Sequence, residues 1–269
     1  MAQKSQIVKP ASTKIVTAKP GDLSPERLAR MKADAGKGQS THVEDTIVPF
    51  LKVLQPLSPQ CIKKGQGYIE GAEPGDFYLT ASSDPLIKNE DGFIFQPCFR
   101  RRDWVEWVPR EDGGGFAGRF DYNYQDRSNW GRPRDAQRKE DGWTFRRADT
   151  GNDLIDTIYF VGYVWREGLP EAFCIAFAGT AHKVGRTFIT MLKGKHLPTG
   201  EQAPIYDTKW LFKSRIQTND KGSWWLMYQE DEGWMGDKEA MLGAALFDQM
   251  ATDEKKIQET ERVDTSDTM

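Results

Sequence analysis

The chain has 269 residues, of which 29% are charged and 12% aromatic, and its formal net charge is −3. This length suffices to bury a hydrophobic core in one large domain or two small ones, and the nearly balanced charge does not by itself require an anionic partner. Three widely separated cysteines and only three histidines argue against a disulfide framework or structural zinc, and predict a reducing compartment. Without a membrane-length apolar run or the apolar core of a signal peptide, we expect a soluble cytoplasmic protein.

Residues 1–42 carry eight Lys and Arg against three acids and contain no aromatic residue. A segment with so little apolar content cannot offset the entropy of ordering, so we expect a flexible basic arm. A short helix is expected within "SPERLARMKAD", where Ser24 can cap the first turn and Pro25 suits the first helical position.

Residues 43–236 alternate short apolar runs with Gly, Pro and Asp, as in "YIEGAEPGDFYLT", "DTIYFVGYVW" and "SWWLMYQ". Enrichment in β-branched and aromatic residues, with turn residues between the runs, is typical of strands and predicts a mostly β domain. Within it, residues 111–152 are dense in Gly, Arg and aromatics. We interpret them as a long inserted loop, which at this length is usually functional or partly disordered.

Two helices are predicted in the C-terminal half. The segment "TAHKVGRTFITMLKGK" (180–195) places apolar residues on one face (Val184, Phe188, Met191, Leu192) and mostly basic ones on another (Lys183, Arg186, Thr190, Lys193). The segment "DKEAMLGAALFDQMA" (237–251) is also typical of a helix. From residue 237 onward nine acids face four bases, so residues 237–269 are expected to form a helix followed by an acidic, disordered tail.

The chain contains no complete enzyme motif. "ADAGKGQST" (33–41) lacks the spacing of a phosphate-binding loop, and "GGGF" (113–116) has no nucleophile elbow to accompany it. The histidines (His42, His182, His196) have no partner that argues for general base catalysis. Four carboxylates at irregular spacing are interpreted as paired charges on a solvated loop (Asp121, Asp126, Asp135, Asp141). We therefore expect no enzymatic activity, no metal and no cofactor.

The most informative segment is "FRRRDWVEWVPR" (99–110). If residues 93–108 form a strand, one face carries Arg100, Arg102 and Trp104, and the other carries Phe99, Arg101, Val105 and Trp107. Both faces then combine arginine with aromatic residues, which a strand with one core face and one solvent face would not need. Single-stranded nucleic acid requires this pairing, because cations neutralise phosphates and flat rings stack on unpaired bases.

The pairing of arginine with aromatic residues recurs in "NYQDRSNWGRPR" (123–134), "WTFRR" (143–147) and "KWLFKSR" (209–215). A second interpretation stays equally open. Tryptophans of several predicted strands can simply fill a barrel core, with surface arginines paired to neighbouring acids (Trp104, Trp107, Trp210, Trp224, Trp225).

The order of "VPFLKVLQPLSPQ", "YIEGAEPGDFYLT", "FRRRDWVEWVPREDGGGF", "AFAGTAHKVGRTFITML", "APIYDTKWLFKS" and "KGSWWLMY" resembles bacteriophage single-stranded DNA-binding proteins over about residues 47–236. The resemblance implies an OB-fold, a small Greek-key barrel, with an acidic C-terminal tail. The insertion at 111–152 is longer than a minimal barrel needs. The predicted fold is thus mostly β (α+β), an OB-like Greek-key β-barrel with a long inserted loop, one or two helices and disordered termini.

We expect a DNA-binding protein without sequence preference that acts in phage DNA replication or recombination, in the cytoplasm of the bacterial host. The acidic tail is expected to occupy the cationic groove in the free protein and to recruit replication or recombination proteins. Self-association into a homo-oligomer stays open. The residues expected to contact DNA are Arg100, Arg101, Arg102, Trp104, Trp107, Arg110, Tyr122, Tyr124, Trp130, Trp143, Lys183, Arg186 and Lys193.

Two alternatives come from other functional classes. A virion structural or assembly protein would pack its aromatic β surface against other subunits, and would need a large exposed apolar patch. A metal-dependent nuclease would use the aspartates of the 111–152 segment with a divalent cation.

Overall fold

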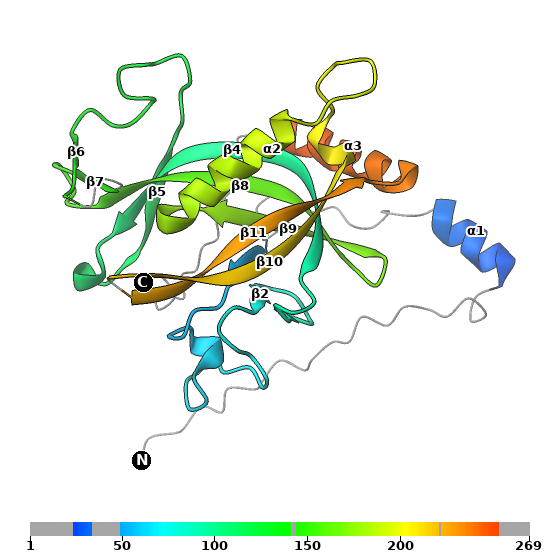
Figure 1. Cartoon of the computed structure of the whole chain (residues 1–269), viewed down its shortest axis with the longest axis horizontal. Coiled ribbons are helices and arrows are strands. Elements are labelled where there is room, and N and C mark those ends of the chain that lie inside the picture. Colours follow the sequence, from blue (N-terminus) through cyan, green and yellow to red (C-terminus); the bar gives the residue numbers. More distant parts are fainter. Residues whose placement is uncertain (1–23, 34–48, 141–143, 221, 253–269) are drawn as a thin grey trace.

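A computed structural model describes residues 24–33, 49–140, 144–220 and 222–252, and shows one strongly curled, mostly β structure (Figure 1). The helices of this part are α1 (Pro25–Ala33), α2 (His182–Lys193) and α3 (Asp237–Thr252). The strands are β1 (Phe50–Val53), β2 (Phe77–Leu79), β3 (Leu86–Ile87), β4 (Phe93–Val108), β5 (Gly115–Asp121), β6 (Ala136–Arg138), β7 (Thr144–Arg147), β8 (Asp153–Arg166), β9 (Leu169–Phe177), β10 (Thr208–Asn219) and β11 (Gly222–Trp234). No helix among the described residues is long and apolar enough to cross a membrane.

The strands form one sheet in the order β11-β10-β4-β8-β9-β1-β2-β3. Its axis is the antiparallel pair β4–β8, which runs in register from Ile94 opposite Trp165 to Trp107 opposite Asp153. A bulge between Pro97 and Phe99 shifts this register by one residue. Because side chains alternate along a strand, the bulge changes which face each later residue of β4 occupies.

The sheet curls into an open half-barrel, and a side-chain amide links the segment after β1 to the edge strand β11. Nε2 of Gln55, just after β1, donates to the backbone O of Trp225 in β11, and Oε1 of Gln55 accepts from the backbone N of Trp225, both at 2.9 Å. Gly75 lies so close that an added Cβ would be 2.7 Å from the Trp225 ring. The expected mostly β fold with few helices is confirmed, and the OB-type Greek-key barrel stays a prediction.

Helix α2 covers the concave face of the sheet, and its Phe188 packs into the hydrophobic core between helix and sheet. The Phe188 ring lies 4.8 Å from that of Phe160, 5.1 Å from Trp210 and 5.3 Å from Phe212, and all four residues are fully or almost fully buried. The predicted helix is confirmed, and its basic residues Lys183, Arg186 and Lys193 are exposed as expected.

Helix α3 packs on the convex face, where Leu246 and Met250 join a second buried cluster with Tyr159 and Val161. A buried glutamine of β4 fixes the position of this helix. Nε2 of Gln96 donates to the backbone O of Glu239 at 2.8 Å. The predicted C-terminal helix is confirmed, and it packs directly on the sheet.

The segment expected to be a long loop consists mostly of turns and irregular structure, but three short strands join it to the sheet. It contains β5, which pairs with β4, and the β6–β7 hairpin, which pairs with β8 through β7. These strands lie at one end of β4 and β8 (Figure 1). A third small buried cluster there contains Trp104 and Leu154. We call residues 109–152 the lobe. The pairing of β5 with β4 and of β7 with β8 gives the lobe a defined structure, which its composition alone did not predict.

Helix α1 confirms the short helix expected in the N-terminal arm, because Ser24 Oγ accepts a hydrogen bond from the backbone N of Arg27 at 3.2 Å. The rest of the expected basic arm and the acidic tail after Thr252 lie outside the described residues.

Replacing Gln55 by Ala should lower the free energy of unfolding by about 2 kcal/mol, because two partly buried backbone groups of Trp225 lose their partners. Chemical denaturation followed by circular dichroism measures this change. Gln137→Ala, at an exposed position of β6, is the control and should change it by about 0.5 kcal/mol or less. Equal unfolding midpoints for the two variants would show that the Gln55 contact does not stabilise the curled sheet.

Candidate functional site

A cleft of about 600 Å³ opens where β4 and β8 extend beyond the start of α2 into the lobe. Its walls combine aromatic rings with arginines from several elements. The lining residues are Arg102, Trp104, Tyr122, Trp130, Arg132, Ala136, Arg138, Thr144, Phe145, Ile155, Asp156, Gly179, His182 and Arg186.

Three rings on one side of the cleft are stacked in a row. Tyr122 lies between Trp104 and Trp130, with ring centroids 5.8 and 6.0 Å apart and interplanar angles of 21° and 16°. Trp104 is 4% exposed, whereas Trp130 is 37% exposed. The row therefore runs from a buried indole to one that is open to solvent. Phe145 meets Trp104 edge-on at 5.5 Å and continues the aromatic wall.

The loop that carries Trp130 holds it in an unfavourable backbone conformation. Its φ is +58°, a left-handed value that costs a bulky residue about 1–3 kcal/mol. Two hydrogen bonds fix this geometry: the backbone O of Trp130 accepts from Nε1 of Trp104 at 3.0 Å, and its backbone N donates to the O of Asp126 at 2.8 Å. Such strain is typical of functional sites and marks Trp130 as the ring that the loop presents.

Arg102 is bound within the protein. Its guanidinium donates from Nε to Asp156 at 2.8 Å and lies 4.0 Å from the centroid of the Tyr122 ring. Burial is the largest influence on the pKa of Arg102 and lowers it, but the hydrogen bond to Asp156 and the charge of this carboxylate together raise the pKa above its usual value. Nε2 of His182 also lies 3.2 Å from Asp156, without the alignment of a good hydrogen bond. Arg102 therefore positions Tyr122 and adds little free charge.

Arg132, Arg138 and Arg186, which we call the arginine trio, form no ion pair with any carboxylate in the described part of the chain. Arg132 lies 3.9 Å from the Phe145 ring centroid, and its buried Nε has no hydrogen-bond partner there. Burial, and then the charge of Arg138, lower the pKa of Arg132. Among the described residues, the trio is thus a set of cations without a carboxylate counterion.

Five of the residues predicted to bind DNA come together in the cleft: Arg102, Trp104, Tyr122, Trp130 and Arg186. Two others are held by contacts outside it. Arg101 is bound to Asp103 at 2.7 Å and also to Asp121. Trp107 packs edge-on against Phe116 at 6.0 Å.

The remaining predicted residues are more exposed. Tyr124 contacts Tyr122 at 4.9 Å, and Arg100 lies 6.0 Å from the Tyr124 ring. The others with exposed side chains are Arg110, Lys183 and Lys193. Trp143 lies outside the described residues.

The sequence prediction missed several lining residues. Arg132 and Phe145 stand in the recurring arginine and aromatic segments, which was the available signal, but the site prediction did not include them. Arg138, Asp156 and His182 reach the cleft from β6, β8 and α2. No local pattern reveals this convergence, since it depends on how the lobe pairs with β8.

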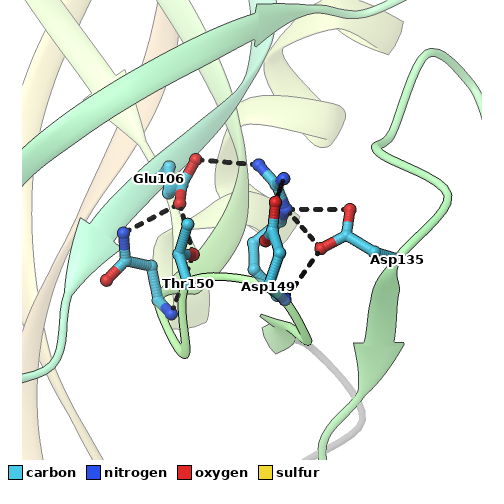
Figure 2. Close-up of polar contacts among 6 residues, drawn as sticks. Glu106, Asp135, Asp149 and Thr150 are labelled. Atoms are coloured by element: carbon cyan, nitrogen blue, oxygen red, sulfur yellow. Dashed lines mark hydrogen bonds and ion pairs between the residues drawn. The ribbon is translucent and has the colours of Figure 1, made fainter.

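Two acidic residues of the lobe, Asp135 and Asp149, and the neighbouring Glu106 of β4 are engaged with bases and hydroxyls (Figure 2). Arg147 donates to Asp135 at 2.8 Å and to the buried Glu106 at 3.1 Å, and it also contacts Asp149. Oε1 of Glu106 accepts from Thr150 at 2.8 Å. The hydrogen bond from Arg147 lowers the pKa of Asp135 to about 2, so this contribution to stability is complete above about pH 4 and is lost as the pH falls towards 2.

The other carboxylates considered for a metal site are also separate. Asp121 contacts Arg101, and Asp126 accepts hydrogen bonds from Ser128, while Asp141 lies outside the described residues. Where the structure is described, no three His, Cys, Asp or Glu residues gather in a way that could hold a metal ion.

Replacing Arg147 by Met should destabilise the lobe by about 3 kcal/mol, because it leaves the carboxylate of Glu106 buried without its cation. The neighbouring Arg146→Met is the matched control, since Arg146 is more exposed and pairs at the surface with Asp153. Thermal unfolding of both variants measures the difference. A shift in melting temperature as large for Arg146→Met as for Arg147→Met would contradict this account.

Comparison with known proteins places the chain in a family but assigns it no activity. A family model described as "Pam3 phage gp34-like protein" matches residues 18–261. No curated protein and no solved structure matches the chain. The match agrees with the expected phage origin, whereas single-stranded DNA binding stays a prediction. Because the match spans nearly the whole chain, this protein belongs to the Pam3 phage gp34-like family.

Proposed function

We propose that this phage protein binds single-stranded DNA without sequence preference, in the cleft between the lobe and α2. The observation that carries the proposal is the arginine trio, unpaired among the described residues, beside the exposed ring of Trp130. Guanidinium groups bind phosphates, and aromatic rings stack on unpaired bases of any sequence. Duplex DNA should bind less well, because its bases are already stacked and paired.

The two classes of arginine have different parts in this proposal. Arg101 and Arg102 are bound to aspartates, so their net contribution to phosphate binding is small. The arginine trio offers charge that no carboxylate of the described chain neutralises. DNA can therefore bind the trio without breaking an existing ion pair.

The proposed biological setting is phage DNA replication or recombination in the cytoplasm of the bacterial host, with the curled sheet acting as an OB-like binding surface. The protein acts by binding and not by catalysis, and it needs no cofactor. The acidic C-terminal tail is proposed to recruit replication or recombination proteins.

Titration of the protein with a poly(dT) oligonucleotide, and with a duplex of matched length, tests the proposal through tryptophan fluorescence. We expect quenching by the single strand that weakens steeply with salt. A triple Ala variant of the arginine trio should reduce the slope of log affinity against log salt by about 2, since each lost phosphate contact contributes about 0.7. Arg215→Ala, an exposed β10 arginine outside the cleft, is the control. Affinity independent of salt would refute the phosphate contacts.

Deleting residues 253–269 should strengthen binding to the same oligonucleotide several-fold at low salt, because the acidic tail would no longer compete for the cationic cleft. Fluorescence titrations of the full chain and of the truncated chain measure the change. Addition of the tail as a free peptide should reverse it. Identical affinities would remove the case for competition by the tail.

A virion assembly role is the second candidate, favoured by apolar side chains exposed on α3. Met241 is 74% exposed and Phe247 is 38% exposed. Such a protein would form a stable oligomer and show no preference for single strands. Light scattering after size-exclusion chromatography, together with the titrations above, separates the two functions.

A further inference from the structure

We propose that the cleft accommodates one nucleotide, with its base on Trp130 and its phosphate between Arg138 and Arg186, so that a free mononucleotide is itself a ligand. This inference rests on the proposed function and makes it more specific. It predicts a pocket that holds a single nucleotide, whereas a protein that only coats the strand would need a continuous groove.

The size of the cleft favours a single unit. Its volume of about 600 Å³ lies within the range of roughly 300–1,000 Å³ typical of sites that enclose one small ligand. Grooves that follow a single strand contact about 4–16 nucleotides in each OB-type domain. A cleft of this volume therefore suits one base with its sugar and phosphate.

The aromatic wall offers one open stacking surface. Tyr122 is stacked on both Trp104 and Trp130, and Trp104 is buried. Arg132 covers the ring of Phe145 at 3.9 Å. Of the rings that line the cleft, Trp130 is the one with a substantially exposed side chain, so the wall has room for one base.

The cations that would bind the phosphate come from two different walls. Arg138 belongs to β6, whereas Arg186 belongs to the first half of α2. The start of this helix also lines the cleft, with no acidic residue in its first turn and no side chain capping it. The helix dipole places a partial positive charge at this end, which favours an anion.

Little in the lining opposes a negative charge. Asp156 is the one carboxylate among the lining residues, and Arg102 already binds it with two hydrogen bonds. Its charge is therefore balanced before a ligand enters. The residues that line the cleft therefore carry a net positive charge, which comes from the arginine trio.

Isothermal titration of the full chain with thymidine 5′-monophosphate tests the inference, with thymidine and inorganic phosphate as partial ligands. The nucleotide should bind and displace a poly(dT) oligonucleotide, and each partial ligand should bind at least about tenfold more weakly, as loss of a stacked base or a phosphate contact implies. Trp130→Ala and Arg138→Ala should each weaken nucleotide binding about tenfold. Trp234→Ala and Arg215→Ala replace exposed residues outside the cleft and should leave it unchanged.

The outcomes separate this inference from the proposed function. If the oligonucleotide binds but the mononucleotide neither binds nor competes, the single-unit pocket is wrong and DNA binding stands. If the mononucleotide binds and no oligonucleotide does, the pocket stands and the proposed function is wrong. If inorganic phosphate binds as tightly as the nucleotide, or the Trp130 variant binds as well as the parent, the stacking surface is overturned.

Discussion

The antiparallel pairing of β4 with β8 is the interaction on which the rest of the structure depends. One half of this ladder carries the concave core beneath α2, and the other half supports the lobe and the cleft. The bulge after Pro97 determines which side chains of the second half of β4 face the cleft. Phe95 and Arg102 face the same side only because one extra residue separates them on β4. In a regular strand, Arg101 and Asp103 would have faced the cleft.

Much of the fold follows from local sequence patterns. The strand expected at 93–108 has those bounds in the structure, and the helix expected near His182 places Phe188 in the core and Arg186 at the surface. These elements are long and their periodicity is clear, so local pattern was sufficient. The short strands β5, β6 and β7 lack such a signal. Each pairs with its neighbour along the chain, β5 with β4, β6 with β7 and β7 with β8, but the strands are too short for their alternation to stand out from the surrounding turn residues.

The candidate site was predictable in kind but not in detail. The frequent pairing of arginine with aromatic residues pointed to the lobe and to "FRRRDWVEWVPR". It could not show which arginines have carboxylate partners, because Asp156 is far from Arg102 in sequence and meets it only across the β4–β8 ladder. Three consecutive arginines therefore have unequal surroundings. The arginine trio lies elsewhere: Arg186 was predicted from its helix face, and Arg132 stands in a segment with the right composition, but nothing in the sequence distinguished Arg138.

The amide of Gln55 also covers part of an exposed edge of the sheet. Strand β11 is the last strand at one end of the sheet, so its outer backbone groups are a template on which another chain could pair. Gln55 occupies both hydrogen-bonding groups of Trp225, near the centre of an aromatic run that would otherwise be prone to intermolecular pairing. Gln55 therefore leaves no free backbone group for another chain at this position of the edge, so a residue far from the candidate binding surface limits where a second copy could pair with β11.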